Sequence, residues 1–313
     1  MARSERGTTL VIVNPASAGG KTERRWPDLR AALDAAGIAF SVHPTAGPGD
    51  ATVAARDALR GGVQRIVAVG GDGTLNEVVN GFFSDDGTPV RADAELGILP
   101  SGTGGDFRKS IHIPLDPAKS VGILAGGKTR PVDAGKIEFA DGMVRYFINI
   151  ADCGIGGEVV ARVNRSRFKG GGIRGTAVFL STSLTVLMTF GSRDVDLTID
   201  GETIHRSIQN VVLANGRYFG GGMCIAPNAE LDDGKLDVVI LKRMSRLQSL
   251  LGMPKIYKGT HLSLDTVETR RAAVVTVVPK DRGALLFDVE GEQVGQAPAT
   301  IRCLPGALRL CVP

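Results

Sequence analysis

Three glycine-rich turns in the first third of the chain carry residue types that bind phosphate. They span Asn14 to Gly20, Gly70 to Thr74 and Ser101 to Asp106, and each follows a predicted strand. Glycine lets the backbone come close to a phosphate, whose charge is held by backbone N–H groups and by the dipole of the next helix. In a parallel sheet such ligands bind beyond the carboxyl ends of the strands. The three turns therefore predict a nucleotide phosphate site.

Asp72 is the most informative residue of these turns. A carboxylate among glycines would repel bound phosphates unless a cation lay beside it, so Asp72 predicts Mg²⁺ held by this carboxylate and the nucleotide. The turn is not a P-loop, because no GxxxxGK[ST] occurs. The segment Asn14 to Gly20 also lacks the glycine spacing of a dinucleotide-binding fingerprint.

The elements around these turns alternate between strand and helix. We predict strands at Thr8–Val13, Ile38–His43, Arg65–Val69 and Leu96–Leu99, and helices at Thr22–Ala36, Asp50–Arg60, Thr74–Asn80 and Asp116–Ala125. A capping box between Thr74 and Glu77 is expected to begin the third helix. This order predicts a parallel sheet with helices on both faces. Past about Pro131 strands dominate, Asp200-Gly201 predicts a hairpin turn, and one helix is expected around Ile173–Phe190.

The stretch Gly70-Gly71-Asp72-Gly73-Thr74 resembles the GGDGT signature of the diacylglycerol kinase catalytic-domain family, which also includes sphingosine and ceramide kinases and bacterial lipid kinases. NAD kinases carry a related version. Further segments resemble family motifs in the same order along the chain: Asn14-Pro15 with Gly19-Gly20, Leu99 to Phe107, Gly220 to Pro227, Asp232-Asp233-Gly234 and Glu290-Gly291-Glu292.

The resemblance implies two domains. Residues 1–130 would form an α/β nucleotide-binding domain like those of phosphofructokinase and NAD kinase, with residues 304–313 packing back on it. Residues 131–303 would form a mostly antiparallel β-sandwich that binds the lipid. The implied reaction is transfer of the γ-phosphoryl group of ATP to a lipid hydroxyl, with Mg²⁺.

The resemblance also implies site residues. ATP contacts are expected from Asn14, Thr45, Gly70, Gly71, Asp72, Gly73, Thr74, Leu75, Asn76, Gly102 and Thr103. Asp72 would act in catalysis on the nucleotide side, and Glu290 or Glu292 would be the general base. A structural Mg²⁺ is expected at Asp233, with the backbone carbonyls of Glu230 and Lys235.

Two positions depart from the family pattern. Gly105 stands where the family has Asn before Asp106, which removes a side-chain hydrogen bond. Glu290 stands where the family has Asp, so its carboxylate lies about one methylene farther out, whereas Glu292 keeps the family residue. The sequence leaves the choice of base open, and Asp288 is a nearby third carboxylate.

The lipid and the membrane are expected to meet the second part of the chain. The apolar segment Thr176–Phe190 is shorter than the roughly 20 residues of a membrane span. We read it as either an acyl-binding helix, with Arg165, Arg167, Lys169 and Arg174 near lipid headgroups, or a core helix beside a solvated basic loop. A formal charge of +4 fits a mild attraction to phosphates or anionic lipid. We therefore expect a cytoplasmic, peripherally membrane-associated enzyme that binds no nucleic acid, and the family suggests a homodimer.

Other classes of site are less well supported. The four cysteines form no CxxC pair and are expected to be reduced core thiols. No Ser/His/Asp set is visible. Two alternatives to a lipid kinase remain: a soluble-substrate kinase of the NAD kinase type, and a lipid- or nucleotide-binding regulator that has lost catalysis. The identity of the lipid is open.

Overall fold

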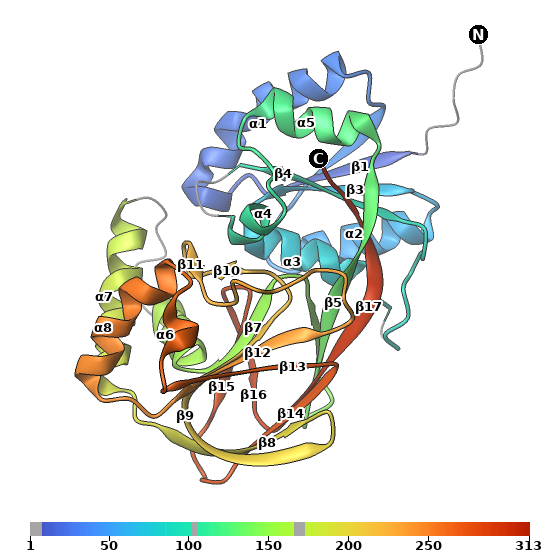
Figure 1. The fold of residues 1–313 in the computed structure, drawn as a ribbon. Helices are drawn as coiled ribbons and strands as arrows, with labels where there is room; N and C mark the ends of the chain where they lie inside the picture. The colour runs from blue at the N-terminus through green and yellow to red at the C-terminus, as the bar shows by residue number, and fades with distance from the viewer. Residues whose placement is uncertain (1–7, 85, 102–104, 166–172) are drawn as a thin grey trace. The chain divides into compact units, whose positions relative to one another are not determined.

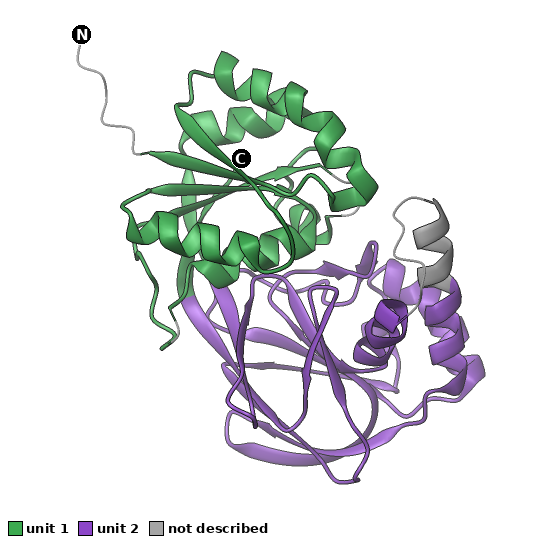
Figure 2. Ribbon diagram, turned by 180° about the vertical axis from the view of Figure 1, so that it is seen from behind, with its two compact units in different colours: residues 1–132, 306–313 green, residues 133–305 purple. Residues whose placement is uncertain are grey.

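The computed structural model describes residues 8–84, 86–101, 105–165 and 173–313, without the side chains of residues 173–180. The chain divides into two compact units, coloured separately in Figure 2. Unit 1 comprises residues 1–132 and 306–313, and unit 2 comprises residues 133–305. The predicted domain boundaries, after residues 130 and 303, lie two residues before these limits. Strands β5 (Thr129–Phe139) and β17 (Ala299–Cys311) contribute residues to both units.

Unit 1 is built on a parallel sheet with the strand order β17-β4-β3-β1-β2. Its complete strands are β1 (Thr9–Val13), β2 (Phe40–Pro44), β3 (Arg65–Gly70) and β4 (Glu95–Pro100). The end of β17 pairs with β4 through Arg309 and Leu310. The parallel α/β arrangement predicted for the first third of the chain is therefore confirmed.

Helices cover both faces of this sheet (Figure 1). They are α1 (Ser17–Ala35), α2 (Asp50–Arg60), α3 (Asp72–Gly81), α4 (Asp106–Ser110) and α5 (Pro117–Gly126). Leu29 and Leu33 of α1 pack with Val121 and Leu124 of α5 against one face of the sheet. Helices α2 and α3 lie side by side on the other face. The buried valines and isoleucines of β1 and β3 thus face helices on both sides, as a doubly covered sheet requires.

The predicted capping box at Thr74 and Glu77 is wrong. Helix α3 begins earlier, at Asp72, with Gly71 in extended conformation as its N-cap, and no side chain caps it. Thr74 is therefore inside the helix and accepts a hydrogen bond from Asn14. Glu77 accepts one from the N–H of Ala51. The motif failed as a capping signal because the helix has already begun at Asp72, two residues before Thr74.

Unit 2 is an antiparallel β structure. The strand order β16-β15-β7-β9-β8-β14-β17 is extended by β12, which pairs with β9 and β13, and β6 pairs with β5. The strands are β6 (Val144–Phe147), β7 (Ile150–Gly154), β8 (Arg193–Ile199), β9 (Glu202–Ala214), β12 (Leu236–Lys242), β13 (Val267–Ala272), β14 (Val274–Pro279), β15 (Leu286–Val289) and β16 (Glu292–Gln296). Two short strands, β10 (Tyr218–Phe219) and β11 (Met223–Cys224), form a separate ribbon. The predicted hairpin at Asp200-Gly201 is confirmed, because Ile199 pairs with Glu202.

Unit 2 contains more helix than the sequence predicted. The expected helix is α7 (Ile173–Thr189), but α6 (Ile155–Arg165), α8 (Arg246–Tyr257) and the short η1 (His261–Ser263) are also present. Glycines at 156, 157 and 252 and a proline at 254 hid α6 and α8 from a reading by propensity. Within the described residues, no helix combines the length and hydrophobicity needed to cross a bilayer.

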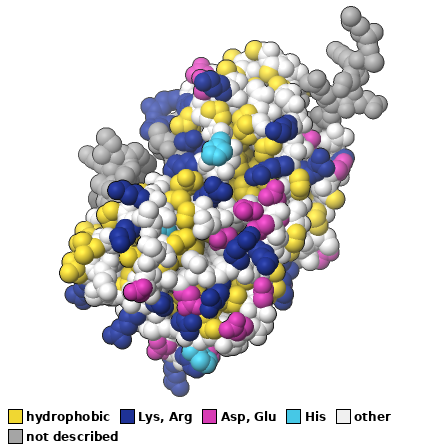
Figure 3. Space-filling view, viewed as in Figure 1, with side chains coloured by type: hydrophobic (Ala, Val, Ile, Leu, Met, Phe, Trp, Pro, Cys, Tyr) yellow, Lys and Arg dark blue, Asp and Glu magenta, His cyan; other side chains and the backbone are white. Residues whose placement is uncertain are grey.

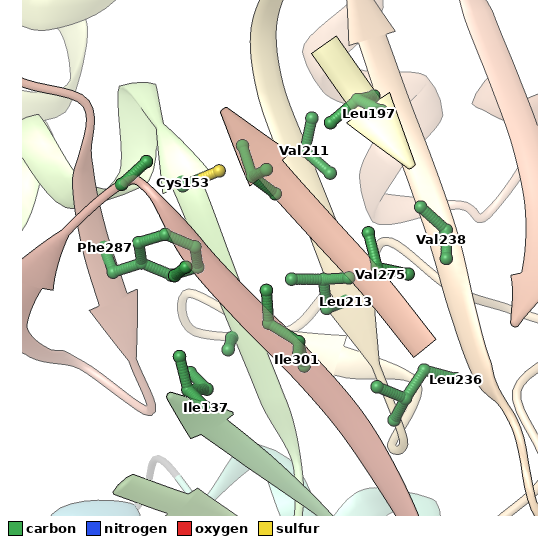
Figure 4. Packing of buried hydrophobic residues seen from close by; sticks show 14 of the residues in the cluster. Ile137, Cys153, Leu197, Val211, Leu213, Leu236, Val238, Val275, Phe287 and Ile301 are labelled. Carbon is green, nitrogen blue, oxygen red and sulfur yellow. The ribbon is translucent and has the colours of Figure 1, made fainter. Parts of the chain in front are cut away.

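The larger of the two hydrophobic core clusters of unit 2 is shown in Figure 4. Phe287, Val211, Leu213 and Val275 are fully buried there, and the rings of Phe139 and Phe287 meet edge to face at 5.4 Å between centroids. Cys153 belongs to this core, and all four cysteines are free and buried. This agrees with the prediction of reduced core thiols. On the opposite face, Ile150 of β7 and Val212 and Ala214 of β9 belong to the second cluster, and the polar groups described below lie on the same strands.

Candidate active site

The three glycine-rich turns lie side by side at one edge of the unit 1 sheet. Adjacent strands β1, β3 and β4 end at Val13, Gly70 and Pro100, and Val13 is the register partner of Val69, as Gly70 is of Pro100. Thr45 follows β2 at the same edge, where its N–H donates to the carbonyl of Val13 at 2.8 Å. Turns that are far apart in the sequence are thus brought together by the strand order, as the parallel sheet predicted.

Side-chain hydrogen bonds join the turns to one another. Asn14 Nδ2 donates to Thr74 Oγ1 at 3.0 Å, which links the first turn to the second. Thr22 Oγ1 and Ser101 Oγ lie 2.5 Å apart and link the start of α1 to the third turn. These bonds fix the described parts of the three turns relative to one another.

Asp72 joins the second turn to the third. Its Oδ2 accepts from the N–H of Asp106 at 2.9 Å, and its Oδ1 accepts from the N–H of Phe107 at 3.4 Å. Burial, and secondarily the charge of Asp106, raise the pKa of Asp72, although the two N–H bonds oppose this. Asp106 is 5% exposed and its Oδ1 lies 2.6 Å from Lys109 Nζ. Two carboxylates thus share this corner of unit 1 with one lysine.

A small hollow opens beside Asp72. The residues that line it come from β3, β4 and the two turns that follow them: Ala68, Gly70, Gly71, Asp72, Leu75, Ile98, Pro100, Gly105 and Arg108. Four residues predicted to contact ATP therefore line a common surface: Gly70, Gly71, Asp72 and Leu75. Of the other predicted contacts, Asn76 has a buried side chain within α3, and Gly102 and Thr103 lie outside the described residues.

Gly70 is required by close packing. A methyl group at this position would lie 2.4 Å from Thr74 Oγ1. We expect Gly70→Ala to lower the free energy of unfolding by about 1–3 kcal/mol, measured by urea denaturation, because the overpacked turn must shift. Gly71→Ala is the matched control, since its added methyl meets no atom within 4 Å and its φ of −102° suits alanine. Equal stability of Gly70→Ala and the wild type would contradict this, because it would show that the turn can shift to accept the methyl group at no cost in folding free energy.

In unit 2, Glu290 occupies a tight turn. Val289 of β15 pairs with Glu292 of β16, so Glu290 and Gly291 form a two-residue hairpin loop with φ values of 54° and 92°. Both values are left-handed, as in a type I′ turn, which favours Asn, Asp or Gly at its first position. A glutamate here is strained, and the strain is offset by its side chain. Glu290 Oε1 accepts from the N–H groups of Ile148 and Asn149, each at 2.7 Å.

Asp288 and Asp152 form a cross-strand pair of carboxylates. They are register partners on β15 and β7, and Asp152 is 1% exposed while Asp288 is half-buried. Asp152 is hydrogen-bonded by the Asn210 side chain, and Asp288 Oδ1 accepts from the N–H of Gly291 at 2.8 Å. In the described part of the chain neither carboxylate forms an ion pair with Lys, Arg or His.

The environment of this pair changes its protonation. Burial raises the pKa of Asp288 to about 7, and the charge of Glu292 adds to this effect. Burial, followed by the charge of Asp288, raises the pKa of Asp152 well above its ordinary value. Glu292 itself is exposed. Asp288 is therefore a half-buried carboxylate that titrates near neutral pH.

In the loop predicted to bind a structural Mg²⁺, the acidic side chain already has a cationic partner from strand β13. Asp233 forms an ion pair with Arg271, and its Oδ1 accepts from the N–H of Lys235 at 2.9 Å. Burial, with the charge of Glu230, raises the pKa of Asp237 to about 6. The guanidinium of Arg271 already balances the charge of Asp233, so Mg²⁺ at Asp233 with the carbonyls of Glu230 and Lys235 stays a prediction.

Comparison with known proteins assigns both parts of the chain. Residues 8–137 match the model of the diacylglycerol kinase catalytic domain, and residues 149–312 match that of the YegS C-terminal NAD kinase beta sandwich-like domain. A diacylglycerol kinase of Staphylococcus haemolyticus is 30% identical over 97% of this chain and 87% of its own length. The chain belongs to the diacylglycerol kinase family. It is a kinase-type enzyme, and its fold of an α/β nucleotide-binding domain followed by a β-sandwich is confirmed.

Other relatives agree with this assignment. A diacylglycerol kinase of Mycobacterium tuberculosis is 29% identical over 99% of this chain and 97% of its own length. Among solved structures, proteins of Bacillus anthracis str. Sterne align with TM-scores of 0.78 at 24% identity and 0.71 at 21% identity. The first covers 100% of this chain and 98% of the other, and the second covers 99% and 98%. At these identities the structures support the fold alone.

The two departures from the diacylglycerol kinase pattern have different physical meanings. Gly105 has a φ of +67° and caps α4, and Asn is the residue that tolerates this left-handed conformation best after glycine. That replacement therefore preserves the turn. Glu290 is different, because its longer side chain reaches the N–H groups of Ile148 and Asn149 and takes a structural role.

Sequence reasoning missed two carboxylates as site residues. Asp106 had a signal, since it ends the third glycine-rich turn. Asp152 had none, because a single aspartate in an apolar stretch gains meaning only from the strand pairing that places it opposite Asp288. Asp288 was considered only as a spare base, and its significance comes from burial, which raises its pKa to about 7.

Proposed function

We propose that this diacylglycerol kinase family member transfers the γ-phosphoryl group of ATP to the hydroxyl of a diacylglycerol-like lipid. The observation that carries the proposal is the convergence of Asn14, Gly70, Asp72 and Asp106 at the carboxyl edge of the unit 1 sheet, in a chain whose relatives are diacylglycerol kinases. Unit 1 binds ATP and unit 2 binds the acceptor lipid.

The ATP phosphates bind at the start of helix α3. The N–H groups of Gly71, Asp72 and Gly73 precede or begin this ten-residue helix, whose dipole favours negative charge at that end. Gly70 packs closely against Thr74, so the turn leaves no room for a side chain at this position. Asn14 holds Thr74 in place and does not need to touch the nucleotide itself.

Asp72 and Asp106 are the residues that would hold Mg²⁺. They fit a divalent cation because Asp72 accepts from the N–H of Asp106, so that two carboxylates lie at one corner of unit 1. Burial, and secondarily the charge of Asp106, raise the pKa of Asp72. When bound, Mg²⁺ neutralises charge on the phosphates and polarises the transferred group. The chain then supplies positioning, which is the larger part of phosphoryl transfer.

Asp288 is our candidate for the general base. As the lipid hydroxyl oxygen forms its bond to the γ-phosphorus and the bond to ADP breaks, the hydroxyl proton passes to this carboxylate. A base is most effective when its pKa lies near the working pH, and Asp288 meets this condition. Glu290 does not fit the role, because its Oε1 already accepts two short hydrogen bonds, from the N–H groups of Ile148 and Asn149. Glu292 is the alternative, since it is exposed and close enough to raise the pKa of Asp288.

The experiment that tests this function is transfer of labelled phosphate from ATP, with Mg²⁺, to a panel of lipids in mixed micelles. Label in diacylglycerol or another lipid alcohol is the expected result and names the acceptor class. Label in NAD, added as the soluble control, would assign the protein to the soluble-substrate kinases. Binding of ATP without transfer to any acceptor would favour a regulator that has lost catalysis.

A further inference from the structure

Helix α8 in unit 2 is packed with its apolar residues outward. Its buried residues are Ser249 and Gly252, whereas Leu247, Leu250 and Leu251 are 65%, 49% and 64% exposed. A surface helix of a globular protein normally buries its leucines and exposes its polar residues. The reversed arrangement leaves a leucine face with nothing from the described part of unit 2 covering it.

Polar contacts hold the helix in this orientation. Ser245 and Gln248 form a capping box at its start. On the inner side, Ser249 Oγ donates to Gln209 Oε1 at 3.2 Å, and Gln209 Nε2 donates to the carbonyl of Met244 at 3.1 Å. Ser249 and Gln209 are 4% and 7% exposed. Because the helix is attached to β9 through these bonds, the exposed leucines are a fixed feature of the fold.

The leucines belong to a larger apolar surface. Nine large hydrophobic side chains are exposed in the described part of the chain, and six of them lie on α7 and α8: Leu184, Met188, Leu247, Leu250, Leu251 and Tyr257. The two helices pack against each other. Figure 3 shows hydrophobic side chains gathered at the lower left, over the region that Figure 1 labels α8, with Lys and Arg side chains beside them. Contiguous exposed apolar surface of this kind marks an interaction site.

The charged residues within α8 and next to it in the sequence are all basic. Arg243, Arg246, Lys255 and Lys258 are exposed within or next to α8, and none forms an ion pair with another described residue. No acidic residue occurs from residue 238 to residue 264. Leucines on a helix lying in the plane of a membrane, flanked by cations only, combine burial in the acyl boundary with attraction to anionic headgroups.

We propose that α8, with the adjoining end of α7, is the surface by which the protein docks on an anionic lipid bilayer. The inference rests on the proposed function only in that a lipid acceptor would be met in a membrane. It places most of the membrane contact on α8, which the sequence did not single out, together with the end of the segment Thr176–Phe190, which it did. It also names the headgroup charge that the surface selects.

The test is sedimentation of the full chain with vesicles, which requires no catalysis. Wild type is expected to bind vesicles containing 30% (about one lipid in three) phosphatidylglycerol at roughly 0.1 M salt, and to bind pure phosphatidylcholine at least tenfold less. The variant Leu247→Gln/Leu250→Gln/Leu251→Gln is expected to bind the anionic vesicles at least tenfold less than wild type. Arg246→Gln/Lys255→Gln/Lys258→Gln should lose the preference for phosphatidylglycerol.

A matched control separates docking from general surface change. Val53→Gln replaces a side chain that is 57% exposed on α2, a helix with both acidic and basic residues, and should bind vesicles like wild type. Glutamine forms helices well, so folding is preserved, and far-UV circular dichroism checks this. Turnover of a short-chain, water-soluble diacylglycerol is expected to be the same in all variants, whereas turnover of a long-chain acceptor in vesicles should fall with binding.

Two results would overturn the proposal. In one, the triple leucine variant binds anionic vesicles as tightly as wild type. In the other, the wild type is a dimer, the leucine variant is a monomer and vesicle binding is unchanged, so that the surface joins two copies of the chain. Vesicle binding without phosphorylation of any lipid would leave the docking surface in place and refute the proposed function instead.

Discussion

Asp72→Asn is expected to lower kcat/KM for phosphoryl transfer by about 10²–10³-fold while the fold is retained. Asparagine keeps an oxygen that can accept the N–H of Asp106, so the link between the second and third turns survives. What is lost is the negative charge beside Asp106, and with it the pair of carboxylates proposed for Mg²⁺. The measurement is steady-state transfer from ATP to the best lipid acceptor, together with thermal unfolding of both proteins.

A second aspartate of unit 1 provides the control. Asp116 caps helix α5 by accepting from the N–H of Lys119 at 2.9 Å, and asparagine serves equally well as an N-cap. Asp116→Asn should therefore leave both turnover and stability unchanged. If Asp72→Asn kept turnover within about threefold of wild type, less than the effect of one oxyanion-hole donor, Asp72 would have a structural role only.

Asp288→Asn is expected to lower kcat by about 10²–10⁴-fold, the contribution of a general base. In the wild type, kcat should rise with pH through about 7, because Asp288 must lose its proton to act, and this rise should disappear in the variant. The pH profile separates a base from a residue that merely supports the site. A profile that keeps its rise near pH 7 in Asp288→Asn would assign the titrating group elsewhere.

Although Asp288→Asn should lose activity, its stability at alkaline pH should be unchanged or higher. The folded protein holds the Asp288 proton more tightly than the unfolded chain, since the pKa is raised from 3.8 to about 7. Asp288 therefore favours folding at acid pH, and its contribution is lost as the pH rises through about 7. We expect Asp288→Asn to unfold at the same temperature as wild type, or higher, at pH 8, so lost activity there cannot be ascribed to unfolding.

Variants of Glu290 and Glu292 test the alternative assignments of the general base. Glu290→Gln is expected to cost about 1.5–3 kcal/mol of folding free energy, because the two hydrogen bonds to Ile148 and Asn149 lose their charge. Its turnover, measured on folded protein, should fall less than tenfold, well below the effect of a lost base. Glu292→Gln removes a negative neighbour of Asp288 and should shift the pH profile to lower pH. A loss of 10²-fold or more in Glu292→Gln would make Glu292 the base.

Local sequence was sufficient to predict much of the structure of unit 1. Glycine, aspartate and threonine at the ends of β-branched runs predicted both the turns and the sheet edge where they meet, because parallel strands place their carboxyl ends together. The hairpin at Asp200-Gly201 was equally predictable, since its left-handed backbone is a local property of those two residues. The same reasoning failed at Thr74, where a capping motif fell inside a helix that had already begun.

The sequence by itself determined the glycine-rich turns, the two-part α/β and β organisation, and the likeness to diacylglycerol kinases, because each depends on residues adjacent in the chain. Only the tertiary structure decided what the acidic residues of unit 2 do. Strand register places Asp152 opposite Asp288, and a turn geometry directs Glu290 to backbone N–H groups. It also decided that α8 turns its leucines outward, because the face that a helix buries is set by its partners, here Gln209 on the inner side.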